Sequence, residues 1–379
     1  MDYHQKLYER PLTLLLYHKA SKMRVPLSGT FELLPVCNMA CKMCYVRKTP
    51  DEVRQHSRPI MEMEEWLEIA ERMRKEGTLY LLLTGGEPFL WKDFWILYER
   101  LHRMGFLISI NTNGTLIDKA VIAKLAELPP LRMNITLYGA NDETYYRLCG
   151  VYGMYKRVID AVEGLCAAGI PVKLNGSITP KNAEDVDALI DFAQSHRLIL
   201  QATTYMFPPV RRDETMVGHN ERFTPQEAAH YRLQIYRRQF GEESYRQYLE
   251  NVLAGISEPL GLDESCIDPL DGKVRCRAGK ASFWITWDGY MSMCGMVPGY
   301  ASDIREKGFE AAWQEVCSIT NHMALSGTCA KCKNIEICHS CAAMAVAESG
   351  TPSGIPHYLC EMVQSMKRIA EEELTAGKR

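Results

Sequence analysis

Three cysteines near the start of the chain could hold an iron–sulfur cluster. Cys37, Cys41 and Cys44 are separated by three and two residues, close enough for their thiolates to bind three corners of one cubane. Three ligands for four irons leave one iron open, as catalytic metal sites do and structural sites do not. The alternatives are a zinc site or cysteines without a shared role. Because neither His nor Cys follows nearby to complete a zinc tetrahedron, the spacing favours a cluster that a small molecule can bind.

A second group of cysteines lies in the last third of the chain. It consists of Cys276, Cys294, Cys329, Cys332, Cys338, Cys341 and Cys360, with Cys266 upstream. Ligands from distant segments can hold together a region that has little core of its own. A pair of zinc sites remains an alternative here, because a four-thiolate zinc site uses the same ligands.

The composition indicates a soluble protein with one large α/β domain and a smaller one. The chain has 379 residues, of which 46% are hydrophobic and 24% charged, and a net charge of -3. Nothing in it predicts nucleic-acid binding, a signal peptide or a membrane span, so we expect a cytoplasmic protein. In that reducing compartment, 14 cysteines are better explained by metal than by disulfides.

Strands and helices alternate between the two cysteine groups. The strands are predicted at residues 30–36, 79–84, 106–111, 132–138, 172–178 and 198–206. The helices are predicted around Trp66, Ala70 and Met73 and at residues 93–104, 118–128, 154–168 and 183–196. This order favours a parallel sheet, open or barrel-like, whose carboxyl-end loops converge with Cys37.

The pattern changes after about residue 207. A loop with two prolines and the run 211–214 is followed by two helical segments, so we expect a lead-in at 1–30, a core at 31–255 and a cysteine-rich domain at 256–379. Residues 203–207 should face the mouth of the barrel. Core packing of Tyr205 and solvated positions for Arg211 and Arg212 are favoured over substrate contact there.

The first cysteine group and the loop after the second strand resemble the radical S-adenosylmethionine (SAM) superfamily. The CxxxCxxC motif of that family, followed by an aromatic residue, is matched with Tyr45 as the aromatic. Gly85-Gly86-Glu87-Pro88 resembles the family's GGEP motif, whose backbone and carboxylate hold the amino group of SAM. Glycines permit close backbone approach, and a carboxylate pairs with an ammonium. The resemblance implies that SAM is contacted by Tyr45, Thr84, Gly85, Gly86 and Glu87.

Weaker SAM contacts follow from the same resemblance. Asn113 and Thr136 occupy places where related enzymes contact the ribose or carboxylate of SAM, with roles as turn and strand residues as the alternatives. Arg147 and Arg157 are candidates for binding the carboxylate, because a guanidinium can bind it bidentately. Cys149 is a candidate functional thiol, whereas Cys166 and Cys317 fit buried core positions.

Several expectations about fold and chemistry follow from this resemblance. The fold would be a partial (β/α)6 barrel of the TIM type. A 4Fe–4S cluster, reduced by a flavodoxin or ferredoxin, would cleave SAM to methionine and a 5'-deoxyadenosyl radical that abstracts a hydrogen atom from the substrate. The residues do not identify a catalytic acid or base.

The second cysteine group resembles the SPASM domain of radical SAM enzymes that modify peptides. One departure is the gap of two residues between Cys338 and Cys341, where the family usually has three. The resemblance implies two auxiliary 4Fe–4S clusters. One would be held by Cys276, Cys294 and Cys341 with Cys266 as a possible fourth ligand, and the other by Cys329, Cys332, Cys338 and Cys360.

The substrate implied by this resemblance is a peptide or protein, which the enzyme would crosslink, oxidise or epimerise. Sulfatase-maturase-like oxidation loses weight, because Gly295 follows Cys294 where those enzymes carry an aspartate base. Only 36 residues precede Cys37, so a leader peptide would be recognised by another surface or another protein. Small-molecule dehydrogenation, an iron–sulfur electron carrier and a zinc-stapled binding protein are the alternatives.

Overall fold

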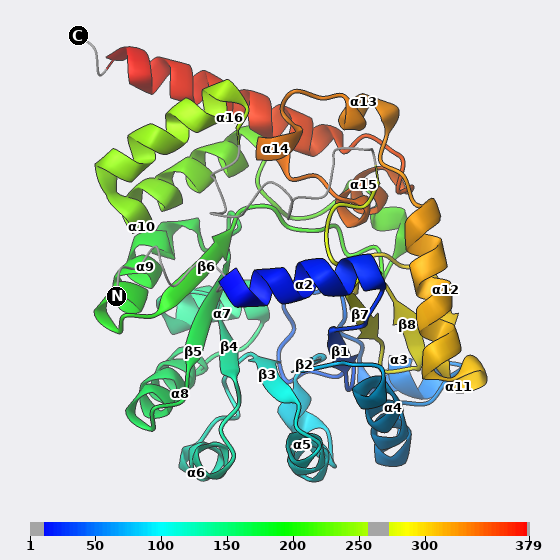
Figure 1. Ribbon diagram of the computed structural model, residues 1–379. Helices are drawn as coiled ribbons and strands as arrows, with labels where there is room; N and C mark the ends of the chain where they lie inside the picture. Colours follow the sequence, from blue (N-terminus) through cyan, green and yellow to red (C-terminus); the bar gives the residue numbers. More distant parts are fainter. Residues whose placement is uncertain (1–10, 257–272, 377–379) are drawn as a thin grey trace.

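Six parallel strands form the centre of the structure, a computed structural model that describes residues 11–256 and 273–376. They are β1 (Ser28–Glu32), β2 (Tyr80–Thr84), β3 (Leu107–Thr112), β4 (Arg132–Leu137), β5 (Val172–Ser177) and β6 (Ile199–Thr203). Successive strands pair in parallel, so their carboxyl ends meet at one edge. The sheet is open, which confirms the expected partial barrel (Figure 1).

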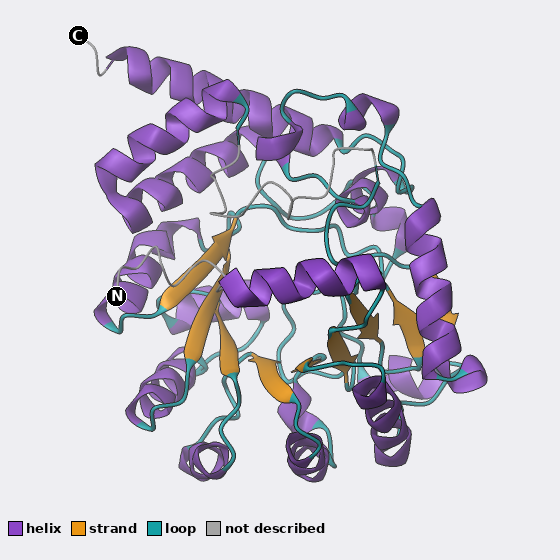
Figure 2. Cartoon of the chain, viewed as in Figure 1, coloured by secondary structure: helices purple, strands orange, loops and turns teal. Residues whose placement is uncertain are grey.

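Helices cover the outer face of these strands (Figure 2). They are α4 (Met63–Lys75), α5 (Phe94–Arg103), α6 (Lys119–Glu127), α8 (Tyr155–Ala167) and α9 (Val186–Ser195). In α4 the buried residues Trp66, Ile69, Ala70 and Met73 recur at helical spacing, which gives the helix one apolar stripe to place on the sheet. Bounds predicted from periodicity agree with these elements to within a few residues.

The first strand is shorter than its sequence pattern predicts. It ends at Glu32, and the apolar residues that follow pair with the GGEP loop through Gly86 N–H to Leu34 O at 2.7 Å and Glu87 N–H to Val36 O at 3.1 Å. This approach requires glycine, because a Cβ on Gly86 would lie 2.2 Å from Val36 O. The GGEP loop therefore packs directly against the segment that leads into Cys37.

The sequence prediction missed several short helices. Besides the 3-10 turns η1 (Pro88–Leu90) and η3 (Glu214–Met216), these are α3 (Pro50–Gln55) and α7 (Asp142–Cys149). The predicted helix at residues 183–196 begins with the 3-10 turn η2 (Ala183–Asp185). Helix α7 has only two turns, too few for a hydrophobic period, but its ends are marked. Asn141 accepts a hydrogen bond from Thr144 N–H at its start, and Gly150 adopts the left-handed conformation at its end.

The C-terminal region continues the sheet of the barrel. Here β7 (Ser282–Ile285) pairs in parallel with β1, and β8 (Tyr290–Ser292) and β9 (Ala301–Asp303) follow in antiparallel order. The helices of this part are α10 (Pro225–Ala254), which turns at Gly241, α11 (Ile304–Lys307), α12 (Phe309–His322), α13 (Gly327–Ala330), α14 (Ile335–Cys338), α15 (Ala342–Ser349) and α16 (His357–Ala376). Helix α16 packs along α10, so the two predicted domains share one sheet and one helical layer (Figure 1).

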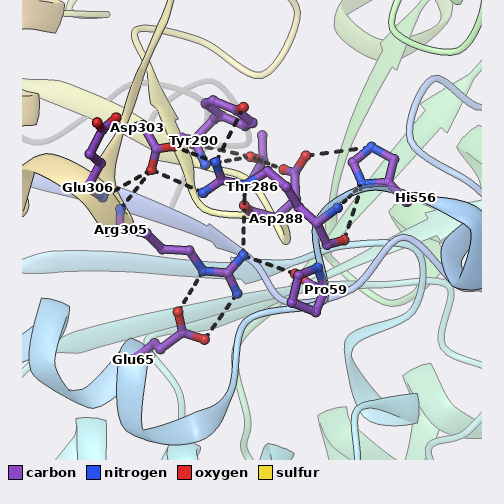
Figure 3. A network of polar contacts seen from close by, with 10 residues as sticks. His56, Pro59, Glu65, Thr286, Asp288, Tyr290, Asp303, Arg305 and Glu306 are labelled. Atoms are coloured by element: carbon purple, nitrogen blue, oxygen red, sulfur yellow. Dashed lines mark hydrogen bonds and ion pairs between the residues drawn. The ribbon is translucent and has the colours of Figure 1, made fainter.

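A polar network joins the C-terminal strands to the barrel (Figure 3). Arg305 from α11 donates to Glu65 of α4 at 2.6 Å and 3.1 Å. Arg58 donates to Asp303 at 3.0 Å and stacks over Tyr290. These partly buried ion pairs fix the segment before α4 against β8 and β9.

Helix α2 (Pro11–Met23) lies across the amino-terminal ends of the strands, away from the edge where the carboxyl ends meet. Its Tyr17 stacks on Tyr80 at the start of β2, and its Ala20 packs with Leu27 and Ala281. In the sequence this segment is only a lead-in with a short apolar run. None of the described helices is both long and apolar enough to cross a membrane.

Candidate functional site

A cavity of about 450 Å³ opens at the carboxyl ends of the parallel strands. Such ends hold the functional site in parallel α/β folds, because the loops that follow the strands converge there. Its lining includes Cys37, Cys41, Cys44, Tyr45, Thr84, Gly85, Gly86, Asn113 and Thr136, all predicted as site residues. The structure thus brings the first cysteine group and most of the expected SAM contacts to one place.

The end of α7 holds the loop that carries the three cysteines. Ala40 N–H donates to Cys149 O at 2.8 Å, and Lys42 N–H donates to Leu148 O at 3.2 Å. The buried Cys149 side chain also shares a hydrogen bond with Cys41. Cys149, a candidate functional thiol in the sequence, is therefore a direct neighbour of the cysteine loop.

The three thiols of this loop differ in their electrostatics. Burial, and further the charge of Glu87, raises the pKa of Cys37 to about 12. Burial also raises the pKa of Cys44, whereas the hydrogen bond from Cys149 lowers the pKa of Cys41. A metal centre needs thiolates, so the positive charge of bound iron has to offset this burial.

The donor set at this loop fits an iron–sulfur cluster better than a single ion. Among residues 11–256 and 273–376, no three His, Cys, Asp or Glu side chains group closely enough to hold one metal ion. A four-iron cluster is wider, since each thiolate binds a different iron. Three thiols that line one cavity fit such a cluster, which they would hold at three irons while leaving the fourth free for a ligand.

The sequence predicts that Glu87 contacts SAM, but Glu87 is not among the described residues that line the cavity. It is fully buried, and its carboxylate accepts hydrogen bonds from Thr112 Oγ1 at 2.8 Å and from Asn113 N–H at 2.8 Å. Burial without a cationic partner raises the pKa of Glu87 to about 7. The motif presents Thr84, Gly85 and Gly86 to the cavity, while its carboxylate ties the loop to the end of β3.

The two arginines predicted to bind a carboxylate lie elsewhere. Arg147 on α7 donates to Lys181 O at 2.8 Å and pairs with Glu184, and Arg157 is exposed on α8. Neither is among the described residues that line the cavity. Both follow β4 in the sequence, but Arg147 is bound by the segment after β5 and Arg157 is exposed on the surface.

The sequence predicts that Arg211 is solvated, but in the structure its side chain is largely buried. Its guanidinium donates to both oxygens of Glu32, at 2.9 Å and 2.8 Å, and to Gly295 O at 3.1 Å. It also lies over the ring of Tyr45, 5.6 Å from the ring centre. Arg212 is exposed as predicted and donates to Cys44 O at 3.2 Å.

Sequence reasoning missed part of the cavity wall. The missed residues are Asn175, Ser177, Met39, Met43, Val46, Arg47, Met296 and Met344. Asn111, Thr112 and Tyr138 also line the cavity, and they belong to the two segments in which the resemblance places SAM contacts. One signal was available, because polar residues recur at the ends of β3 and β5, where an apolar strand core would otherwise continue. Thr203, Tyr205, Met206 and Phe207 also line the cavity; Tyr205 is nevertheless buried, as predicted.

Among the described C-terminal cysteines, the charges that act on Cys294 and on Cys338 come from the members of the same set that the resemblance implies; that these sets hold clusters stays a prediction. Burial, and further the charges of Cys276 and Cys341, raises the pKa of Cys294 to about 11. Burial, and further the charges of three other cysteines, raises the pKa of Cys338 to about 11; these neighbours are Cys360, Cys329 and Cys332. Cys266 lies outside the described residues.

Residues 31–193 match the family described as the Radical SAM superfamily. The match covers less than half of the chain, from the end of β1 through β5 and into α9, and it does not reach β6. A match to this family implies a 4Fe–4S cluster and SAM as cofactors.

Two curated relatives extend the comparison. The AdoMet-dependent heme synthase of Methanosarcina barkeri is 23% identical over 334 residues, which cover 84% of this chain and 92% of that protein. The probable GTP 3',8-cyclase of Saccharolobus islandicus is 32% identical over 166 residues. That match covers 43% of this chain and only about half, 51%, of the relative.

Solved structures share the fold over nearly the whole described chain. AnSMEcpe with bound AdoMet matches with a TM-score of 0.66 at 18% identity, covering 93% of this chain and 98% of that one. SuiB of Streptococcus suis bound to the precursor peptide SuiA matches with a TM-score of 0.64 at 19% identity, covering 92% and 80%. At these identities the similarity establishes the fold alone.

Proposed function

We propose that the protein is a radical SAM enzyme whose cluster is held by Cys37, Cys41 and Cys44 and whose SAM occupies the cavity beside them. The observation that carries this proposal is that the three thiols share one cavity with Thr84, Gly85 and Gly86. When bound, the cluster and SAM supply reductive cleavage of SAM and a 5'-deoxyadenosyl radical for hydrogen-atom abstraction.

The chain's own residues would position SAM and exclude water. The open backbone at Gly85 and Gly86 permits close approach of a ligand, and amide or hydroxyl groups at the strand ends offer hydrogen bonds. Toward the C-terminal region the wall is apolar, with Met206, Phe207, Met296 and Met344. Such a wall shields a reactive intermediate from solvent.

For the substrate we propose a peptide, with two auxiliary clusters in the C-terminal region. The support is the grouping of the C-terminal cysteines and the fold shared with SuiB, which was solved with its precursor peptide. A reductant such as a flavodoxin or ferredoxin would supply electrons.

An iron porphyrin is the second candidate substrate. It is favoured by one observation, the match to a heme synthase over nearly the full length of that relative. The apolar side of the cavity wall would suit a porphyrin face as well as a peptide side chain.

Anaerobic reconstitution tests the proposal. We expect about twelve irons per chain, from three four-iron clusters, and formation of 5'-deoxyadenosine from SAM under dithionite. Cys41→Ala should abolish this cleavage. Cys166→Ala, on α8 and outside the cavity, is the matched control and should retain it. Zinc in place of iron, or cleavage that survives Cys41→Ala, would overturn the proposal.

The two substrates are separated by supplying each one to the reconstituted enzyme. A peptide encoded beside the gene should change mass in the presence of SAM and reductant if the first candidate holds. An iron porphyrin should change instead if the second holds, as followed by mass spectrometry.

A further inference from the structure

The cavity wall has one formally charged side chain besides its thiols. Among the described residues that line it, Arg47 is the only Lys, Arg, Asp, Glu or His. The remaining wall consists of neutral polar and apolar groups. An anionic group that enters the cavity therefore has one strong partner there.

Arg47 has no acceptor among the described residues. Its Nε is buried without a hydrogen-bond partner, whereas Arg211 is bound to Glu32 and Arg222 to Glu348. Only the backbone of Arg47 is engaged, through N–H to Cys44 Sγ at 3.3 Å. A buried donor with no partner is rare in folded proteins, so it indicates an acceptor that binds from outside the chain.

The position of Arg47 places its charge beside the first cysteine group. It follows Cys44 by three residues, and both side chains line the cavity. A ligand bound at Arg47 would therefore lie close to the iron proposed for this loop. Arg147 and Arg157, the arginines suggested by the sequence, cannot take this role from outside the cavity.

We propose that Arg47 binds a carboxylate of the molecule that occupies the cavity. A guanidinium offers two parallel N–H donors that match the two oxygens of a carboxylate. This inference rests on the proposed function, in which the carboxylate has two sources: that of SAM or that of the substrate. Either source would present the same carboxylate group to Arg47, and the two experiments that follow distinguish them.

Labelling with phenylglyoxal, which modifies accessible arginines, tests the site in the reconstituted full-length protein. Peptide mapping then gives the labelled fraction of Arg47, with Arg54 as the internal control because it is exposed on α3. If the carboxylate is that of SAM, SAM should protect Arg47 several-fold and decarboxylated SAM should not. If it is that of the substrate, acetate should protect Arg47 in protein already saturated with decarboxylated SAM and also in protein saturated with SAM.

Equilibrium dialysis of the variants gives a second measurement. With SAM as the source, Arg47→Gln should weaken SAM binding about ten- to a hundredfold and leave binding of decarboxylated SAM unchanged. Arg47→Lys should recover part of the loss, and Arg54→Gln should bind SAM like the wild type. With the substrate as the source, Arg47→Gln should bind SAM like the wild type, and dialysis of labelled acetate against SAM-saturated protein should show binding to the wild type that Arg47→Gln loses.

The inference is overturned if neither SAM nor acetate protects Arg47. In that case the guanidinium serves only to balance the charge of the thiolates. This outcome is distinct from failure of the proposed function, because protein that cleaves SAM can lack the protection and protein that does not cleave SAM can show it.

Discussion

Two glutamates at the ends of neighbouring strands are both fully buried, yet their surroundings are opposite. Glu32 ends β1 and accepts hydrogen bonds from both terminal nitrogens of Arg211 and from Trp284 Nε1 at 2.9 Å. Glu87 follows β2 and accepts hydrogen bonds only from neutral groups of the described residues, on Thr112, Asn113 and Phe89. The two carboxylates are equally buried, but among the described residues only Glu32 is paired with a cation, Arg211.

The presence of a cation at Glu32 and its absence at Glu87 give the two carboxylates different effects on stability. The Glu32–Arg211 pair joins β1 to β7 through Trp284 and to the loop after Cys294 through Gly295 O. A buried pair of this kind is costly to break, because the remaining charge stays in a medium of low dielectric. Glu87 carries no such pair, and its raised pKa of about 7 lets its charge change near neutral pH.

The largest expected effect is that of Glu32→Gln. It leaves Arg211 buried without its counter-charge, so we expect the free energy of unfolding to fall by about 3–5 kcal/mol. Urea unfolding at pH 8 under anaerobic conditions measures this loss. The matched control is Glu87→Gln, which removes an unpaired buried charge and should cost less than about 1 kcal/mol. Equal losses in the two variants would contradict the comparison.

The second effect is a pH dependence that comes from Glu87. Its pKa is raised from 4.5 to about 7, so the folded state binds the proton more tightly than the unfolded state. This contribution is present in full below pH 4.5 and is lost as the pH rises through 7, by up to about 3 kcal/mol. Urea unfolding between pH 5 and 8 measures it as the difference between wild type and Glu87→Gln. A difference that does not change with pH would disprove this account of Glu87.

A smaller loss is expected at a second buried ion pair, which Arg222 forms with Glu348. Arg222 donates to both oxygens of Glu348, which also accepts a hydrogen bond from Tyr205 at 2.7 Å. Glu348→Gln should lower the free energy of unfolding by about 2 kcal/mol, less than Glu32→Gln, because Arg222 keeps bonds to Met206 O and Gly218 O. The same urea assay ranks the two variants, and the opposite order would contradict this reasoning.

The smallest effect is that of Thr112→Val. It removes the hydroxyl that donates to Glu87 and should cost about 1 kcal/mol. Because that hydrogen bond lowers the pKa of Glu87, its loss should also move the pH midpoint upward. Thr115→Val, which alters a hydroxyl bonded to Asn113 instead, should leave the midpoint in place.

The sequence predicted the elements better than the directions of the side chains. The period of apolar residues is local, so the strands and outer helices were placed within a few residues. Arg147, Arg211 and Glu87 were each given the wrong surroundings, because their partners lie in other segments: Glu184 for Arg147, Glu32 for Arg211 and Thr112 for Glu87. Periodicity carries no information about such pairs.

The sequence by itself predicted the match to the radical SAM superfamily, since the spacing of Cys37, Cys41 and Cys44 and the Gly85-Gly86 pair are local patterns. It also predicted two sets of C-terminal cysteines, and that each set holds a cluster stays a prediction. Only the tertiary structure decided that Glu87 turns inward, that the C-terminal strands extend the barrel sheet, and that Arg47 is the charged residue facing the cavity. The reason is that burial and pairing depend on which segments meet across the fold, and residues far apart in sequence decide both.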